Sequence, residues 1–141
     1  MKHILVICIG NICRSPLAEG LLKKELPHHV VFSAGLSALV GQSADPLSVK
    51  IAEEHGFNIQ EHRAQQVAAW MCQQADLILV MERGHKDQLQ KIFPWARGKI
   101  FCLNEKDIDD PYCQSRSHFD TAYSEISNGV FDWVSKVKKL A

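Results

Sequence analysis

Apolar and polar positions change in blocks along this chain, and the blocks predict strands that alternate with helices. Four short, continuous apolar runs are typical of parallel strands that are buried on both faces of their sheet. The predicted strands cover His3–Ile9, His29–Ser33, Asp76–Met81 and Lys99–Leu103. Runs of this length are far too short to cross a membrane, so no membrane insertion is expected.

Between these runs, apolar residues recur every three or four positions, which predicts helices with one buried stripe. Ser15 is expected to cap the first helix, with Pro16 at its first position. The helices predicted in this way cover residues 16–26, 46–55, 65–74, 85–93 and 117–140. A polar, acidic loop is expected over residues 104–115.

Strands and helices in this alternation predict a single three-layer α/β domain over residues 1–141. We expect a four-stranded parallel sheet with helices on both faces and right-handed crossovers between strands. Hydrophobic residues make up 46% of the chain, which is enough for a sizeable core. Ligands bind such sheets at the carboxyl ends of the strands, and Cys8 lies at that end of the first strand.

Charge and cysteine content argue against several classes of protein. The 16 basic and 16 acidic residues give a formal net charge of +0, which does not fit a protein that binds nucleic acid or anionic membranes. No signal-peptide pattern occurs, so a cytoplasmic location is expected. The five cysteines are odd in number and irregularly spaced, unlike a disulfide framework. Neither they nor the seven histidines show metal-ligand spacing, so we expect no metal and no cofactor.

The stretch from Cys8 to Pro16 carries the most specific chemistry in the chain. A loop that leads into a helix offers an anion several backbone N–H donors and the positive end of the helix dipole. Gly10 and Asn11 tolerate the left-handed backbone angles that a ring of such donors needs. Arg14 adds a planar, permanently charged fork for a phosphoryl group. The same positive field favours the thiolate of Cys8, the expected nucleophile.

The predicted phosphate-binding residues are therefore Ile9, Gly10, Asn11, Ile12, Cys13, Arg14 and Ser15. A structural interpretation of the same stretch stays open. In that interpretation Cys8 is an inert buried thiol and Arg14 is a surface cation. The glycine and asparagine between them then form an ordinary turn.

The stretch resembles the Cys-x5-Arg-Ser signature of low-molecular-weight protein-tyrosine phosphatases. The resemblance covers nearly the whole chain, because further motifs follow in the family's order: Ser33-Ala34-Gly35, Asp45-Pro46, His55-Gly56, His62-Arg63-Ala64 and Asp110-Pro111-Tyr112. Segment 36–41 lacks the bulky aromatic residue of the eukaryotic members. The resemblance is therefore to the bacterial type that is paired with tyrosine autokinases of exopolysaccharide or capsule export.

A carboxylic acid is needed as well, because the departing phenolate must be protonated. Asp110 is the candidate because the proline that follows it stiffens its loop, but Asp107 and Asp109 are rivals on the same loop. Asp-Pro is also a common turn signal, and Asp45-Pro46 is interpreted only as a helix start. The resemblance implies Asp110 as the acid. Together with an ionised thiol, it implies a bell-shaped pH–rate profile on the acid side of neutrality.

The resemblance also implies supporting roles. Ser33 and His62 would hold the phosphate loop, although each also fits an ordinary strand-end or surface position. Cys13 would resolve the oxidised nucleophile as a disulfide, although it also fits a small side chain packed behind the loop. Leu39 and Tyr112 would rim a pocket deep enough to favour phosphotyrosine over the shorter phosphoserine.

The favoured function is hydrolysis of phosphotyrosine through a cysteinyl-phosphate intermediate, by a monomer that acts on a protein such as a tyrosine autokinase. Two alternatives stay open. A thiol-dependent arsenate reductase would need a resolving cysteine pair around the third strand, where only Cys72 is near. A phosphoryl carrier or a non-catalytic phosphotyrosine-binding module would lack Arg14 or Asp110, and both are present.

Overall fold

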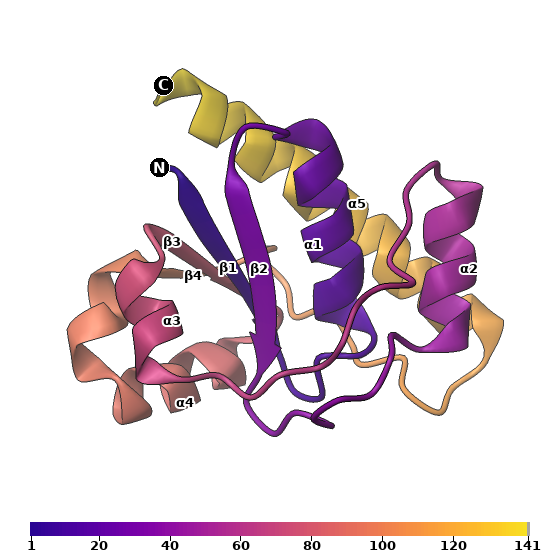
Figure 1. The fold of residues 1–141 in the computed structure, drawn as a ribbon, viewed down its shortest axis with the longest axis horizontal. Helices are drawn as coiled ribbons and strands as arrows, with labels where there is room; N and C mark the ends of the chain where they lie inside the picture. The colour runs from indigo at the N-terminus through magenta and orange to yellow at the C-terminus, as the bar shows by residue number, and fades with distance from the viewer. Residues whose placement is uncertain (141) are drawn as a thin grey trace.

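The computed structural model describes residues 1–140, which form a parallel sheet between two layers of helices (Figure 1). The strands are β1 (His3–Cys8), β2 (Val30–Gly35), β3 (Leu77–Val80) and β4 (Ile100–Cys102). Their order in the sheet is β2-β1-β3-β4, and all neighbouring strands are parallel. The predicted α/β class and four-stranded parallel sheet are therefore confirmed.

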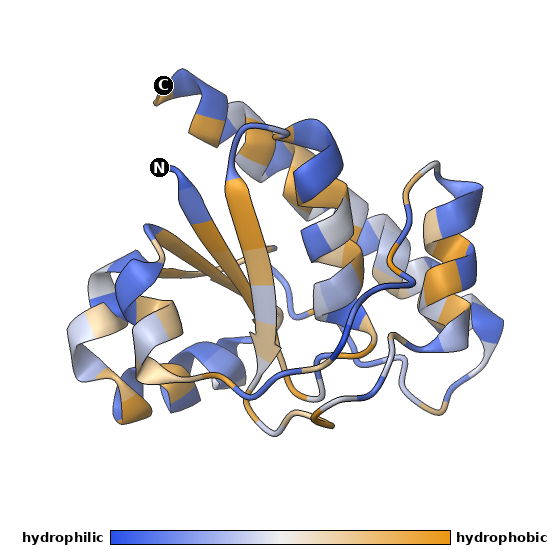
Figure 2. Cartoon of the chain, viewed as in Figure 1, coloured by the Kyte–Doolittle hydropathy of each residue, from blue (hydrophilic) through white to orange (hydrophobic). Residues whose placement is uncertain are grey.

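Helices cover both faces of this sheet. They are α1 (Arg14–Glu25), α2 (Pro46–Glu54), α3 (Ala69–Gln74), α4 (Arg83–Ile92) and α5 (Arg116–Lys139), with a 3-10 helix, η1 (Pro94–Lys99), before β4. In Figure 1, α1, α2 and α5 lie on one side of the sheet, and α3 and α4 lie on the other. Figure 2 shows that the strands are mostly hydrophobic, whereas the helices mix hydrophobic and hydrophilic positions.

The side chains of β1 alternate between two hydrophobic cores, one on each face of the sheet. Ile4 and Val6 pack into the core that α1, α2 and α5 complete. Leu5 and Ile7 pack into the core that α3 and α4 complete. All four side chains are fully buried. A strand that is covered on both faces requires a continuous apolar run, which is why the hydrophobic pattern located β1 correctly.

The carboxyl end of β1 is the point where the strand order reverses, because the chain next forms β2 on one side of β1 and later β3 on the other. Loops at such a point splay apart and leave room for a ligand. In Figure 1 the strand arrows point towards this end, where the loops after β1 and β2 lie side by side. None of the helices formed by residues 1–140 is both long and apolar enough to span a membrane.

The start of α1 differs from the prediction. The helix begins at Arg14, and Ser15 lies inside its first turn and does not cap it. The Ser15 hydroxyl instead faces the Cys8 sulfur and the Asn11 amide. The chain therefore uses a typical helix-capping residue for a contact across the preceding loop.

Two further elements differ from the prediction. The helix predicted from residue 65 begins only at Ala69, because residues before it run extended beside β2, where Gly35 pairs with Gln66. The 3-10 helix η1 has no counterpart among the predicted elements. The sequence indicates Pro94 only as the end of the preceding helix, but it also begins η1. Each difference arises where a loop packs against a neighbouring element, which the local pattern does not record.

Candidate active site

The backbone between β1 and α1 forms a ring whose carbonyl groups are held from outside. The carbonyl oxygens of residues 8–12 accept hydrogen bonds at 2.6–3.0 Å. Their donors, in order, are the backbone N–H groups of Leu36, Ser37 and Leu39, the Nε2–H of His62, and the backbone N–H of Asp45. The neighbouring loops therefore fix each of these peptide units in a single orientation.

The N–H groups of the same peptide units point to the inside of the ring, because N–H and C=O lie on opposite sides of a trans peptide. Within residues 1–140, the backbone N–H groups of residues 9–13 donate to no backbone carbonyl. The first N–H groups of α1, which a helix always leaves unpaired, add to this set. Converging N–H groups of this kind are what an anion-binding nest requires, and anion binding by the ring stays a prediction.

Asn11 is the residue that bends the ring, with a φ of 61°. Asparagine tolerates this left-handed conformation better than other residues with a Cβ atom. Of the two residues that tolerate this conformation, Gly10 does not adopt it, because its φ lies outside the left-handed region. A Cβ atom on Gly10 would lie 3.8 Å from Leu39, which is an ordinary contact.

The Asn11 side chain orients the proton of the Ser15 hydroxyl. Its Oδ1 accepts from the backbone N–H of Gln65 at 2.9 Å, so its Nδ2 must be the atom that faces Ser15 at 2.8 Å. The Ser15 oxygen therefore accepts from Asn11 and has its own proton to donate. That proton is directed at the Cys8 sulfur, 2.9 Å from the Ser15 oxygen. A donor in this position stabilises a thiolate.

Ser33 and His62 hold Asn11 from the outer side. Asn11 Nδ2 donates to the Ser33 hydroxyl at 2.9 Å, and His62 Nε2 donates to the Asn11 carbonyl at 2.6 Å. The Ser33 hydroxyl donates in turn to Glu19, whose carboxylate lies 3.9 Å from His62 Nδ1 and accepts from Lys23 at 2.6 Å. This chain of contacts joins α1, β2 and the segment before α3 to the ring.

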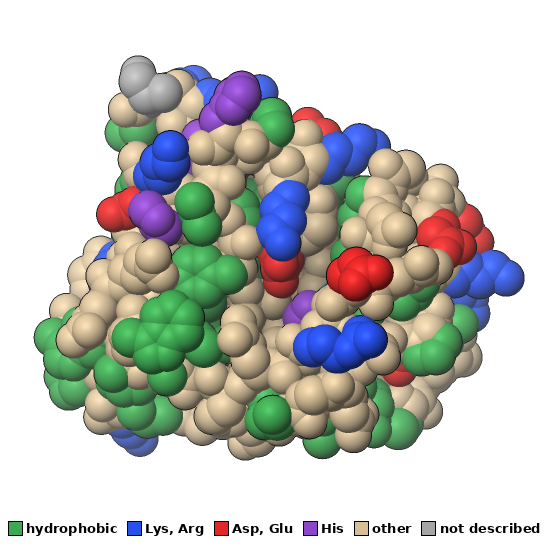
Figure 3. All heavy atoms as spheres, viewed as in Figure 1, with side chains coloured by type: hydrophobic (Ala, Val, Ile, Leu, Met, Phe, Trp, Pro, Cys, Tyr) green, Lys and Arg blue, Asp and Glu red, His purple; other side chains and the backbone are tan. Residues whose placement is uncertain are grey.

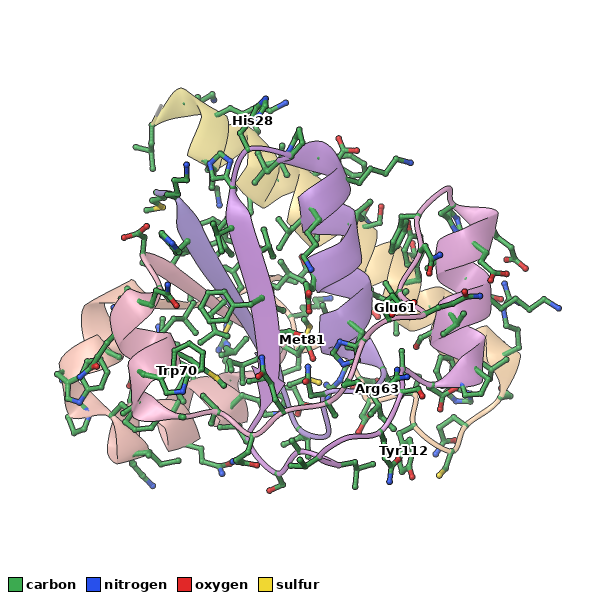
Figure 4. All side chains as sticks on the ribbon, in the orientation of Figure 1. His28, Glu61, Arg63, Trp70, Met81 and Tyr112 are labelled. Atoms are coloured by element: carbon green, nitrogen blue, oxygen red, sulfur yellow. The ribbon has the colours of Figure 1, made fainter. Side chains whose placement is uncertain are left out.

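The outer end of this network opens into a hollow of about 290 Å³ between α1, β2 and residues 58–65. Charged and histidine side chains gather around the middle of the face shown in Figure 3. Figure 4 labels two residues that line the hollow, Glu61 and Arg63. The ring is thus supported from a solvent-accessible side as well as from the core.

Arg14 is buried to 1% exposure and divides its donors between the protein and the pocket. Its NH1 donates at 2.6 Å both to Glu82 and to the carbonyl of Ile108, which uses both NH1 protons. Its Nε is buried and has no partner within residues 1–140, and its NH2 lies 3.8 Å from Asp110. The Nε and NH2 edge therefore remains as a two-pronged fork for an oxyanion.

The loop that carries Asp110 is anchored at Ile108. The Ile108 N–H donates to the Met81 carbonyl at 3.0 Å, and its carbonyl accepts from Arg14. Asp107 is engaged elsewhere, because its carboxylate accepts the Arg83 backbone N–H at 2.9 Å at the start of α4.

Asp110 lies at the mouth of a cavity of about 150 Å³ above Cys8. Cys8, Arg14, Leu39, Asp110 and Tyr112 all line this cavity. Of the three acidic candidates, only Asp110 lines it. Tyr112 is half exposed and sits on the lower edge of the molecule in Figure 4, beneath the carboxyl ends of the strands. The structure therefore brings the sequence-predicted nucleophile, cation, acid and rim residues into one pocket.

The comparisons with known proteins decide the family. A family profile described as low molecular weight phosphotyrosine protein phosphatase matches residues 3–141. The chain is 47% identical to the probable low molecular weight protein-tyrosine-phosphatase AmsI of Erwinia amylovora, and the alignment covers 99% of both proteins. The chain belongs to the low-molecular-weight protein-tyrosine phosphatase family.

Solved structures agree with this assignment. The AmsI crystal structure has a TM-score of 0.92 and covers 96% of this chain and 92% of its own. Vibrio vulnificus Wzb, solved with benzylphosphonate, is 43% identical with a TM-score of 0.93 and coverage of 96% and 98%. The YwlE arginine phosphatase of Geobacillus stearothermophilus is 32% identical with a TM-score of 0.93 and coverage of 99% and 94%. The predicted bacterial subgroup and the predicted enzyme class, a phosphotyrosine hydrolase, are confirmed.

Cys13 of this phosphatase lines the same cavity as Cys8. Burial, and next the nearby Asp45 carboxylate, raise the pKa of the Cys13 thiol well above its usual value. Its sulfur lies 3.8 Å from Asp45 Oδ2. The thiol form is therefore favoured at Cys13, and a role as a resolving thiol would require a change in this environment.

Several residues of this phosphatase site had no distinct signal in the sequence. Glu19 forms an ordinary i,i+4 pair with Lys23, which hides its contact to Ser33. Gln65 acts through its backbone N–H, which carries no sequence signal. Glu82 does have a signal in the sequence, because it follows a buried strand, β3, whose carboxyl end lies at the edge of the sheet where ligands bind.

Within residues 1–140, no group of three or more His, Cys, Asp or Glu side chains is arranged to hold a metal ion. The donors that the pocket offers an anion are instead the ring N–H groups and the fork of Arg14.

Proposed function

We propose that Cys8, Arg14 and Asp110 carry out phosphotyrosine hydrolysis in two steps, through a cysteinyl phosphate. The observation that supports this most strongly is the ring of residues 9–13: its N–H groups have no backbone acceptor within residues 1–140, and the ring lines one cavity with the buried Cys8 sulfur and with Arg14, whose Nε is unpartnered there. A phosphoryl group gains negative charge on its equatorial oxygens during transfer. Fixed donors that need no reorganisation stabilise that charge.

In the first step, the Cys8 thiolate attacks phosphorus and the bond from phosphorus to the tyrosyl oxygen breaks. Asp110, in its acid form, gives its proton to that oxygen, so that neutral tyrosine leaves. The Ser15 hydroxyl donates a hydrogen bond to the sulfur before attack and keeps its proton, which favours the thiolate. Arg14 and the ring N–H groups hold the three equatorial oxygens.

In the second step, water attacks the phosphorus of the intermediate. Asp110, now a carboxylate, takes a proton from this water, and the bond between sulfur and phosphorus breaks. Inorganic phosphate leaves, and Cys8 returns to the thiolate that the Ser15 hydroxyl stabilises. One carboxyl group thus serves as acid and then as base, which its place at the pocket mouth allows.

The depth of the sulfur supports tyrosine as the phosphorylated residue. Cys8 is 3% exposed at the base of the cavity, and Leu39 and Tyr112 stand at its rim. A phenyl ring spans this depth and contacts the rim side chains, whereas a phosphoserine side chain is too short to bring its phosphorus to the sulfur. Phosphoarginine is the competing long substrate, since YwlE is named as an arginine phosphatase.

The arsenate reductase alternative has less support. Cys72 is fully buried in the core on the α3 and α4 side of the sheet, whereas Cys8 packs with the opposite core. A reductase needs a second thiol that reaches the nucleophile, and the sheet separates these two cysteines. Hydrolysis needs no second thiol.

Aryl-phosphate hydrolysis by wild type, Cys8→Ser and Asp110→Asn tests the proposal. We expect no turnover from Cys8→Ser, because a hydroxyl in that position is not ionised near neutral pH. Asp110→Asn should lose much more activity with phenyl phosphate than with an aryl phosphate whose leaving group is already acidic. Equal losses with both esters, or turnover by Cys8→Ser, would contradict the assigned roles.

The physiological substrate is proposed to be a tyrosine autokinase of exopolysaccharide or capsule production, dephosphorylated in the cytoplasm. The five cysteines form no disulfide with one another in the structure, which fits a reducing compartment. A monomer suffices, because one chain supplies every residue that lines the cavity above Cys8. Release of phosphate from a tyrosine-phosphorylated autokinase tail, compared with phosphoserine and phosphoarginine peptides, tests this specificity.

A further inference from the structure

His85 is a buried histidine that lies beside Glu82, the carboxylate that accepts a hydrogen bond from Arg14. It lies in the first turn of α4 and is 4% exposed. Its Nε2 is 3.3 Å from Glu82 Oε2, the same oxygen that accepts from Arg14 NH1 at 2.6 Å. Its Nδ1 is buried and has no hydrogen-bond partner within residues 1–140.

These contacts define the proton on the His85 ring. The Glu82 carboxylate, which can only accept, lies 3.3 Å from Nε2, so the neutral ring that carries its proton on Nε2 is the favoured tautomer. Burial lowers the pKa of His85, and the nearby Arg14 acts in the same direction, while the carboxylates of Glu82, Asp107 and Asp110 oppose both. The neutral ring therefore leaves a bare acceptor, Nδ1, in the protein interior. An apolar side chain in this place would avoid that unfavourable burial.

We propose that His85 is a positioning residue for phosphoryl transfer: its ring, with Nε2 3.3 Å from Glu82 Oε2, keeps the Glu82 carboxylate in the orientation that aims the free edge of Arg14 at the substrate. The inference rests on the proposed function, because it concerns the same phosphoryl site. Glu82 needs such a hold because its side chain is 32% exposed, and its carboxylate can turn to water. Arg14 is almost fully buried and cannot follow it.

Loss of the Glu82 contact would leave the Arg14 NH1 with the Ile108 carbonyl as its remaining partner. A guanidinium held at one point can tilt about that point. A tilt displaces Nε and NH2, the two atoms that would grip the phosphoryl oxygens. The effect of His85 is therefore expected on phosphate affinity and turnover, and not on the stability of the fold.

The test compares His85→Leu, which removes the donor, with His85→Gln, whose side-chain amide can donate to Glu82. We expect His85→Leu to weaken competitive inhibition by inorganic phosphate and to lower aryl-phosphate kcat/KM by about tenfold or more, as for a lost polar contact to a charged group beside the site. His85→Gln should recover most of both. The melting temperature of His85→Leu should be unchanged or higher, because the unpartnered Nδ1 is gone.

His29 provides a matched control. It also has a buried Nδ1 without a partner within residues 1–140, but it lies before β2, at the opposite end of the sheet. His29→Leu should leave phosphate inhibition and kcat/KM at wild-type values. An equal loss in His29→Leu and His85→Leu would show that the effect is general and would overturn the proposal.

A double-mutant cycle with Glu82→Gln tests whether His85 acts through Glu82. If it does, His85→Leu should have little further effect on kcat/KM once Glu82 is changed. Additive losses, or wild-type activity in His85→Leu, would overturn the positioning role. Failure of the proposed function is a separate result, because it would appear in the wild-type enzyme as turnover that does not depend on Cys8.

Discussion

Among the residues of the phosphate loop, Asn11 should be the one whose substitution most lowers the stability of the fold. Two substitutions separate the contribution of its side chain from that of its backbone conformation. Its side chain makes three hydrogen bonds of 2.8–2.9 Å, to Ser15, Ser33 and the Gln65 N–H. Either Asn11→Gly or Asn11→Ala removes all three. At roughly 1 kcal/mol for each bond, the lost hydrogen bonds alone should lower the free energy of unfolding by about 3 kcal/mol in both variants.

Asn11→Ala should lose roughly 1 kcal/mol more than Asn11→Gly, because alanine is strained at a φ of 61° and glycine is not. Urea unfolding of both variants, with their m-values compared, measures this difference. Both variants should also lose aryl-phosphate activity, because the Ser15 proton is no longer directed at the sulfur. Equal stability of the two variants would refute the backbone part of this reasoning, and a loss below about 1 kcal/mol in both would refute the hydrogen-bond part.

Two further positions give independent predictions. Gly35→Ala should strongly destabilise the protein in thermal unfolding, because its Cβ would clash with the Ile9 carbonyl oxygen. Gly10→Ala, with 3.8 Å from its Cβ to the nearest neighbour, should keep most of the stability. Asp76 accepts the backbone N–H groups of Lys2 and His3, which lowers its pKa below the usual 3.8. The stability that this carboxylate adds is therefore present above pH 3.8 and is lost as the pH falls through the lowered value, so the gap between wild type and Asp76→Asn should close in acid.

The sequence predicted best those features that depend on residues close together in the chain. The buried strands follow from continuous apolar runs, and α5 follows from apolar residues at helical spacing. Cys8 and Arg14 lie within one loop and helix start, so their meeting follows from the chain's own path. The predicted start of α1 is wrong because a serine at this position can either cap a helix or make a contact within the loop. Only the fold shows that the Ser15 hydroxyl accepts a hydrogen bond from the Asn11 amide.

The supporting contacts could not be predicted because they join residues far apart in sequence. Glu82 reaches Arg14 over 68 positions, and the Gln65 N–H reaches Asn11 over 54. Both contacts depend on which strands are neighbours and on how far each loop extends beyond the sheet. A single sequence shows neither the order of the strands nor the extent of the loops. A polar residue that follows a buried strand indicates that it lies near the site, but it does not say which atom it will hold.

Arg14 belongs to the phosphate loop and also contacts two residues that are distant in sequence, Glu82 and Ile108. Its NH1 is fully used by Glu82 and the Ile108 carbonyl, so its other edge is aimed at the pocket by protein contacts made before any substrate arrives. The Ile108 contact also anchors the loop that carries Asp110. One guanidinium therefore sets the geometry between the group that would hold the phosphoryl oxygens and the acid that would protonate the leaving group. Such preorganisation is what electrostatic catalysis requires, because the donors need not move as charge develops.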